Sequence, residues 1–307
     1  MLQFGLRLHN YDSWEITKRS AILAEKMGFD SLWLNDHVLQ PAGPTDEKFR
    51  EAWSSLAGLA ALTKKLKVGT LVACNGFRSP PLLAKMAATL DVLSGGRLIL
   101  GMGAGWFEEE YRSYGIPFRT RGERMQMLEE SVKIIRTMLE DGRAIFNGKY
   151  YHLDNALSNP VSKPRPPIWI GGAGNRLLGI AARLGDGWNC YRMPVDEFRA
   201  KKRIFDEKRR RTNRKDPQVI SFVTDGIVAR TQRRVGVLAR RAARAMGVDP
   251  ERYRRLAPSI VIGTASEAAG RIREFQEAGV QHLILNFPAL EESNLEYFGE
   301  EVLPQFR

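Results

Sequence analysis

The stretch of sequence with the clearest chemical potential is a short apolar run that opens into alternating glycines. Residues 98–100 are apolar, glycines then alternate over 101–105, and 108–110 follow as an acidic helix start. A strand that ends in glycines ahead of a helix lets the backbone approach a flat or anionic ligand. The spacing is G-x-G-x-G, whereas a dinucleotide site needs G-x-G-x-x-G. The ribose-binding acid expected about 20 residues further on falls in a basic helical region, where Glu123 or Glu129 is a poor candidate.

Two other places combine glycine or arginine with a helix start and are candidates to hold a phosphate. The run GGAGNR over 171–176 reads as glycines feeding a helix, and Arg121 and Arg124 open another helix. Free N–H groups at helix starts attract anions, and an arginine there can bind a phosphate with two hydrogen bonds. The alternative is tight turns that need glycine for their shape. Two such places on neighbouring strands favour one extended, phosphate-bearing cofactor.

The composition is that of an ordinary soluble globular protein. The 307 residues are 43% hydrophobic and 27% charged, which suits one α/β barrel or two smaller domains. The start of the chain has no basic segment followed by an apolar one, and no apolar run approaches the ~20 residues of a membrane helix. We therefore expect a cytoplasmic protein without a membrane partner. Cys74 and Cys190 form no disulfide framework and have no metal-ligand spacing, so we expect no metal.

The net charge of +12 is built mainly from arginine, and the excess is concentrated in residues 199–255. One interpretation is a pair of solvated helix faces. Another is an electrostatic field that attracts a polyanionic small molecule. Nucleic-acid binding is disfavoured because no interleaved aromatic residues and no recognition motif accompany the arginines, so we expect no nucleic-acid partner.

Strand-like apolar runs alternate with helical patterns along the whole chain. We expect strands over 3–8, 29–34, 66–73, 97–101, 167–170, 187–191, 219–229 and 282–286. We expect helices over 13–27, 51–63, 81–93, 121–140, 176–184, 195–211, 231–247 and 265–278. This alternation predicts the α/β class, as a closed (β/α)8 TIM barrel rather than an open doubly wound sheet. Residues 1–307 form a single domain in this interpretation, with insertion segments near 142–166 and 230–262.

In such barrels the active site lies at the carboxyl ends of the strands. Of the four histidines, His9 and His37 follow strands and converge on that end, whereas His282 begins a strand and His152 lies in an insertion. His37 has Asp36 beside it and is the better acid–base candidate. The alternative for His37 is a partly buried residue that anchors a loop.

Four segments resemble the bacterial luciferase-like monooxygenase superfamily, and within it the oxidoreductases that depend on the deazaflavin coenzyme F420. The longest is TLVACNGFRSPPLLAKMAATLDVLSGGRLILGMGAGWFEEEYRSYGIPF, residues 70–118. The others are GFDSLWLNDHVLQP (28–41), PIWIGGAGNRLLGIAARLGDGWN (167–189) and GTASEAAGRIREFQEAGVQHLILNF (263–287). The resemblance implies a TIM barrel with an insertion, and a flavin or deazaflavin at its carboxyl-terminal face.

The resemblance also implies roles for single residues beside the cofactor ring. Asp36 and His37 match an Asp-His pair near the deazaflavin ring, in which the histidine donates or accepts a proton. Ala73, Cys74 and Asn75 match a bulge that backs the ring, where many relatives have a cis peptide bond that does not involve proline. The bond here would be Ala73–Cys74 or Cys74–Asn75.

Further residues match the parts of the site that hold the rest of the cofactor. Gly103, Ala104 and Gly105 match the segment along the ribityl chain, and Gly171 and Gly172 the backbone donors near the phosphate. Asn189, at the end of the 187–191 strand, is expected to bind the cofactor as well. Bacterial luciferase has a cysteine and an arginine where this chain has Gly103 and Ala104, so the phosphate role of that arginine would pass to Arg124 or to backbone amides.

The resemblance predicts hydride transfer between reduced F420 and a small organic substrate, with a proton supplied by His37. His9, Trp106 and Phe77 are expected to line the substrate pocket. F420-dependent glucose-6-phosphate dehydrogenases carry a glutamate just after the glycines, where this chain has Trp106, which argues against a sugar phosphate as the substrate.

Two alternatives stay open. One is an FMN-dependent monooxygenase that uses O2 and receives reduced flavin from a separate flavin reductase. The other is a non-catalytic barrel that binds flavin or a partner. Relatives are often dimers, so a homodimer is one expectation.

Overall fold

The chain folds into a closed barrel of eight parallel strands, as the sequence predicts. A computed structural model describes residues 1–41, 48–288 and 291–307, without the side chains of Arg252 and Arg254 in the arginine-rich segment. In the order of their neighbours around the barrel, the strands are β1 (Gln3–Arg7), β2 (Ser31–Leu34), β3 (Lys67–Thr70), β5 (Leu98–Gly103), β8 (Ile168–Gly171), β9 (Gly187–Tyr191), β10 (Val219–Val228) and β12 (His282–Asn286). Pairing of β12 with β1 closes the ring.

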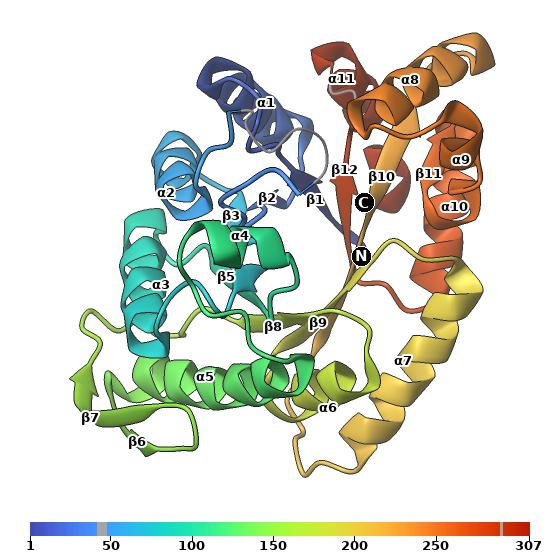
Figure 1. Ribbon diagram of the computed structural model, residues 1–307. Helices are drawn as coiled ribbons and strands as arrows, with labels where there is room; N and C mark the ends of the chain where they lie inside the picture. Colours follow the sequence, from blue (N-terminus) through green and yellow to red (C-terminus); the bar gives the residue numbers. More distant parts are fainter. Residues whose placement is uncertain (42–47, 289–290) are drawn as a thin grey trace.

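Helices surround the barrel on the outside (Figure 1). The helices that connect its strands are α1 (Trp14–Met27), α2 (Ala52–Leu62), α3 (Pro80–Ser94), α5 (Arg121–Asp141), α6 (Asn175–Leu184), α7 (Val195–Arg210), α8 (Gln232–Ala245) and α10 (Ala265–Glu277). Local signals fix their ends: the Ser13 hydroxyl accepts from the Ile16 amide at the start of α1, and Thr120 and Glu123 form a capping box on α5. The acidic helix start predicted at 108–110 is the beginning of a short helix, α4 (Glu108–Ser113), whereas α9 (Pro250–Arg254) and α11 (Glu292–Glu301) were not predicted.

The two predicted insertions have different structures. Residues 142–166 contain an antiparallel hairpin, β6 (Arg143–Asn147) and β7 (His152–Leu157), which lies against α5 (Figure 1). Glu130 on α5 fixes it by accepting from the backbone N–H groups of 149–151. The second insertion packs α8, α9 and the short strand β11 (Val261–Gly263) around a small apolar cluster of their own, and β11 pairs with the end of β10. The remaining short strand, β4 (Ala73–Cys74), pairs with β5.

The barrel interior is filled by a layer of large side chains below its carboxyl-terminal end. Trp33 and Trp169 stack with ring centroids 5.2 Å apart, and Val223 and Ile284 pack beside them. His282 belongs to the same region: it is fully buried and lies within hydrogen-bonding distance of the Ser31 hydroxyl, at 2.8 Å. The expectation that His282 sits away from the reactive end of the barrel is therefore confirmed.

The burial of His282 predicts acid sensitivity. Burial, assisted by the charge of Lys67, lowers the pKa of His282 from 6.5 to about 3. Between these values the unfolded chain binds a proton that the folded chain does not, so stability falls as the pH falls below 6.5. Going from pH 7.5 to pH 5 should remove about 2 kcal/mol through this residue. Urea unfolding of His282→Gln should show a smaller loss over that range, and an equal loss in both proteins would contradict the assignment.

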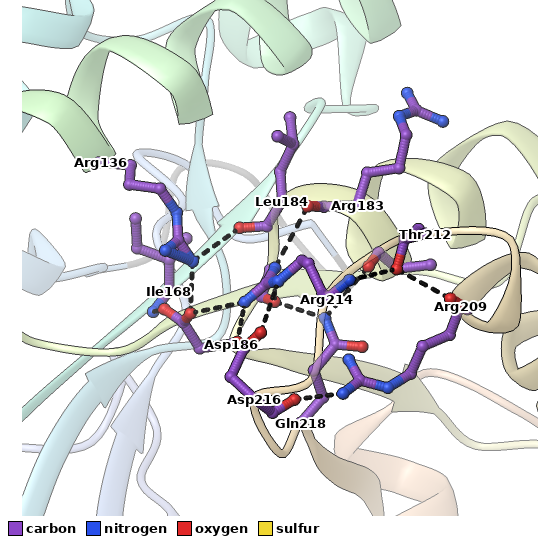
Figure 2. Close-up of polar contacts among 12 residues, drawn as sticks. Arg136, Ile168, Arg183, Leu184, Asp186, Arg209, Thr212, Arg214, Asp216 and Gln218 are labelled. Atoms are coloured by element: carbon purple, nitrogen blue, oxygen red, sulfur yellow. Dashed lines mark hydrogen bonds and ion pairs between the residues drawn. The ribbon is translucent and has the colours of Figure 1, made fainter.

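The end of the barrel opposite the reactive end is held by an ion-pair network around Asp186, just before β9. Figure 2 shows Arg136 and Arg214 reaching this carboxylate, and Arg165 binds it as well, with Nη1 2.7 Å from Oδ2. Burial raises the pKa of Asp186, but the hydrogen bonds of Arg165 and of the Ile168 amide outweigh it, so the pKa lies below its ordinary value.

Ion pairs and hydrogen bonds of this kind also account for part of the arginine excess in residues 199–255. Arg209 donates to the Asp216 carbonyl in this network (Figure 2), while Arg234 and Arg241 both pair with Glu291. Some arginines of this segment therefore stabilise the scaffold. Among the described residues, no helix has the length and apolar character needed to cross a membrane.

Candidate active site

A cavity of about 540 Å³ opens at the carboxyl ends of the barrel strands. It is lined by side chains or backbone of seven strands or of the loops that follow them, namely β1, β2, β5, β8, β9, β10 and β12. This size lies within the range of small-molecule sites, about 300–1,000 Å³. The residues named from the sequence that do line it are His9, Asp36, His37, Ala73, Cys74, Gly103, Gly105, Trp106, Gly171, Gly172 and Asn189.

His37, on the loop after β2, is held by a carboxylate that sequence reasoning did not assign. Its Nδ1 lies 2.7 Å from Glu110 Oε1, on α4. The other Glu110 oxygen accepts from the Val38 amide at 2.7 Å, and the Glu110 side chain is buried. A carboxylate at Nδ1 fixes the ring orientation, and Nε2 has no hydrogen-bond partner among the described residues, so it is the nitrogen that a ligand could reach. The only sequence signal for Glu110 is the acidic helix start over 108–110.

Asp36 has a different role from the one predicted. Its Oδ2 accepts from the Cys74 amide at 2.9 Å and from Arg78 Nη1 at 2.8 Å, and within the described ranges Asp36 forms no hydrogen bond with His37. Burial raises the pKa of Asp36, although Arg78 and the Cys74 amide oppose that shift. Asp36 thus ties β4 to the loop after β2, and the carboxylate that contacts His37 is Glu110 instead. Asp36 Oδ1 is buried without a hydrogen-bond partner among the described residues.

The bulge after β3 lies earlier than predicted. The cis peptide bond is Leu71–Val72, not Ala73–Cys74 or Cys74–Asn75. The sheet register explains this: Gly69 pairs with Ile99 and Ala73 with Met102, so the bulged strand carries one extra residue between them. Residues 73–74 have already returned to regular pairing as β4.

The alternating glycines make room for this bulge. A Cβ atom on Gly103 would lie 2.5 Å from Val72 Cγ2, and one on Gly171 would lie 2.7 Å from Val72 Cγ1. At Gly101 a Cβ atom would lie 2.1 Å from the Thr70 carbonyl oxygen. The spacing that suggested ligand contact therefore serves first to make room for residues 70–72, and Leu71 and Val72 then form one wall of the cavity.

Three residues of the predicted site lie behind this wall. Ala104 and Asn75 are buried and do not line the cavity. Phe77 packs against Tyr111, with ring centroids 5.3 Å apart, and does not line it either. Cys74 does line it, but its Sγ lies 2.9 Å from the Tyr111 hydroxyl, and burial raises the Cys74 pKa to about 12. Cys74 is therefore a neutral thiol near pH 7.

The residues predicted to bind a phosphate, around 171–176, have only part of the expected geometry. The Gly172 N–H donates to the Asn189 carbonyl at 2.9 Å, so it is not free for a phosphate. Amides further along remain, because α6 begins after Gly174 without a side-chain cap. Arg121 lies beside this helix start, with Nη2 3.3 Å from where a Cβ atom of Gly174 would be.

Arg124 does not lie at the start of α6. Its guanidinium lies 4.0 Å from the centroid of the Phe118 ring and donates to the Arg119 carbonyl. One helical turn separates the two arginines in sequence, and only the first, Arg121, points at α6. The structure therefore places Arg121, and not Arg124, at the start of α6.

The wall opposite the bulge carries a polar chain that sequence reasoning largely missed. His9 Nε2 lies 2.7 Å from Asn286 Oδ1, and Asn286 Nδ2 donates to Asp225 Oδ1 at 2.7 Å. Asp225 Oδ2 in turn pairs with Arg192 Nη1 at 2.6 Å. Tyr253 of the second insertion also donates to Asp225, at 3.3 Å. An acid inside the apolar run 219–228 was the one signal available for Asp225.

Trp106 lines the cavity beside His37. Trp106 is 63% exposed, and its edge-to-face contact with His37 has a centroid distance of 5.8 Å. Phe107 makes a similar contact at 6.3 Å. Among residues 1–41, 48–288 and 291–307 there is no cluster of His, Cys, Asp and Glu side chains that could hold a metal ion.

Comparison with known proteins places this geometry in a family context. The family model for luciferase-like monooxygenases matches residues 2–234. The F420-dependent glucose-6-phosphate dehydrogenase of Microbacterium testaceum (strain StLB037) is 30% identical, over 93% of this chain and 91% of that protein. The FMNH2-dependent dimethylsulfone monooxygenase of Pseudomonas putida is 26% identical, over 98% and 91%. A solved F420-dependent secondary alcohol dehydrogenase, in complex with an F420–acetone adduct, superposes with a TM-score of 0.86 at 25% identity, over 100% and 99% of the two chains.

Proposed function

The chain belongs to the luciferase-like monooxygenase family, and on this premise we propose that it is an oxidoreductase that binds coenzyme F420 and exchanges a hydride with a small organic substrate. The observation that carries the proposal is His37, held at Nδ1 by a buried carboxylate, in a cavity whose facing wall is a strand bulge.

The residues of the cavity fit a flat, phosphate-bearing coenzyme. Residues 71–74 offer a mainly apolar surface, and Val72 is kept in place by glycines that have no room for a Cβ atom. Asp36 Oδ1 is a buried acceptor to which no residue in the described ranges donates. At the far end, the uncapped start of α6 and Arg121 offer N–H donors for a phosphate. We assign the ring to the bulge and the phosphate to α6.

Bound F420 would supply the hydride, since its ring carries carbon at the position of the reactive flavin nitrogen. The chain itself would orient the substrate and manage the proton. His37 Nε2 would donate to or accept from the substrate atom that changes its protonation, while Glu110 holds Nδ1 and stabilises the ring when it is positively charged. Trp106 and Phe107 would limit the access of water to His37.

In the second candidate function, the same cavity binds FMN instead of F420, and a flavin reductase supplies the FMN in reduced form. The similarity to the FMNH2-dependent dimethylsulfone monooxygenase supports it. Titrating the purified chain with F420 and with FMN, followed by coenzyme fluorescence, separates the candidates. We expect F420 to bind more tightly by at least about tenfold, or 1.4 kcal/mol. Tight FMN binding without F420 binding would overturn the proposal, and binding of neither would favour a non-catalytic barrel.

The assignment of the phosphate to Arg121 makes a separate prediction. Arg121→Ala should weaken F420 binding about 10-fold, because a charge-assisted hydrogen bond contributes about 1.5–3 kcal/mol. Binding of the deazaflavin ring without its phosphate and tail should not change. Arg124→Ala is the matched control, since its guanidinium lies on Phe118. An equal loss of affinity for intact F420 and for the ring without its phosphate and tail would show that Arg121 does not contact the phosphate.

A homodimer is part of the proposal. α3 exposes Leu82, Val92 and Leu93, and the neighbouring α2 exposes Leu62. The two helices lie side by side on the outside of the barrel (Figure 1). Burial of these side chains against a second copy would remove apolar surface from water. A monomer mass in light scattering at micromolar concentration would contradict this.

A further inference from the structure

Arg7 at the end of β1 places a guanidinium inside the barrel. Arg7 is in register with Trp33 on β2 and with Asn286 on β12. In-register residues of neighbouring strands point to the same face, and Trp33 belongs to the interior layer. Arg7 therefore points inward, above that layer, and its side chain lines the cavity.

The Arg7 guanidinium has no partner in the part of the chain that the structure describes. It forms no hydrogen bond or ion pair with any described residue, and its Nε is buried without an acceptor. The buried Nε–H costs free energy, because it has given up water without gaining an acceptor in its place. Sequence reasoning gave Arg7 no role.

The carboxylates of the cavity do not supply the missing partner, because each is already engaged. Asp36 is paired with Arg78, and Asp225 with Arg192. Glu110 holds His37 and accepts from backbone amides. Among the described residues that line the cavity, Arg7 is thus a cation without a matching anion, although the cavity is the part of the molecule built to receive a ligand.

We propose that Arg7 binds a planar, delocalised anion of the ligand through two parallel hydrogen bonds. A guanidinium presents its donors as a rigid fork that matches two acceptor atoms side by side. Two ligands of the proposed function have this chemistry. One is the reduced coenzyme ring, whose pyrimidine half carries negative charge shared between a ring nitrogen and the adjoining carbonyl oxygen. The other is a carboxylate on the substrate. The proposal rests on the proposed function for the choice of these ligands.

The first measurement uses the chain without coenzyme. Because Arg7→Met removes an unpaired charge and keeps an unbranched apolar stem, its apparent Tm should equal or exceed that of the wild type. A clearly lower Tm would mean that Arg7 stabilises the fold, and would overturn the proposal. Benzoate, as a planar carboxylate probe, is then titrated into the same two proteins.

The second measurement compares anaerobic Kd values for oxidised and reduced F420. If the ring is the anion, Arg7→Met should lose about 10-fold in affinity for the reduced form and little for the oxidised form, and the bound potential should fall by about 30 mV. Arg7→Lys, which keeps the charge, should recover part of this difference. Arg121→Ala should weaken both forms equally.

If the substrate is the source of the anion, the ratio of the two Kd values should not change, and Arg7→Met should bind benzoate at least about fivefold more weakly than the wild type. A variant that changes neither the ratio nor benzoate binding would overturn the proposal while leaving the proposed function intact. A further outcome is that the wild type binds no coenzyme, while Arg7→Met binds benzoate more weakly than the wild type. That result would overturn the proposed function and support Arg7 as the anion site.

Discussion

Replacing His37 by asparagine should lower kcat by about 10²- to 10⁴-fold, the usual contribution of a general acid or base. The variant removes Nε2, the ring nitrogen that the contact between Nδ1 and Glu110 leaves for the substrate. The asparagine Nδ2 can take the position of Nδ1 and still donate to Glu110. The loop should therefore keep its shape, and the Kd of the coenzyme should stay within about twofold.

The control for this variant is His152→Asn on the exposed hairpin. His152 lies 2.8 Å from Asn147 and has no contact with the cavity. Its replacement should leave kcat and Kd as in the wild type. Steady-state rates and fluorescence titration of both variants decide the point. Unchanged turnover in His37→Asn would show that His37 only anchors its loop, which is the alternative that the sequence left open.

The sequence predicted the barrel because each strand and helix carries a local pattern that does not depend on the others. The strands at 187–191 and 282–286 were predicted with the bounds that the structure shows, and α5 and α6 within one residue at each end. α4, by contrast, is only six residues long and has no side-chain cap. The acidic residues at 108–110 predicted its start, but its position depends on contacts with the loop after β2, which lies more than 70 residues earlier, so the sequence did not show that Glu110 meets His37.

The same distinction applies to the site. The rule that barrel strands present their carboxyl ends to the ligand brought His9, His37 and Gly103 to the right cavity. It did not identify which charges pair, because pairing joins residues from different strands. Asp36 precedes His37 in sequence, yet successive residues point in different directions, and Asp36 faces Arg78. The sequence also did not show which of Arg121 and Arg124 lies near α6, because the two residues are about one helical turn apart and point in different directions.

The glycines show a further limit of reading a site from sequence. Their alternation suggested close approach to a ligand, but most of the space they leave at 101, 103 and 171 is taken by Thr70 and Val72. A bulge in the neighbouring strand and a bound ligand make the same demand on a backbone, namely the absence of a Cβ atom. The sheet register between β3, β4 and β5 separates the two explanations, and it is visible only in the folded chain.

Replacing Glu110 by glutamine should reduce kcat by about 10²-fold or more, although Glu110 lies behind His37 and is not assigned a contact with the substrate. The buried carboxylate accepts from His37 Nδ1 with one oxygen and from the Val38 and Leu39 amides with the other. Glutamine has one acceptor and one donor group at these positions. Whichever way it is turned, an N–H group faces either the backbone amides or His37.

If the amide nitrogen faces Val38 and Leu39, two backbone donors lose their acceptor, at a cost of about 1–3 kcal/mol each in stability. If it faces His37, the imidazole must accept at Nδ1 and carry its proton on Nε2. The ring then has the opposite tautomer. Both arrangements remove the negative charge that stabilises the protonated ring, so both lower the rate and change the pH profile of kcat, which a loss of stability alone would not do.

Glu109→Gln is the matched control, because Glu109 is the exposed neighbour on the same short helix. It removes the same charge from the first turn of α4 without touching His37. Glu110→Asp should restore part of the rate, since a carboxylate is again present, although one methylene further from the ring. If Glu110→Gln and Glu109→Gln have the same kcat and the same pH profile, Glu110 only joins two loops, and the orientation of His37 has another origin.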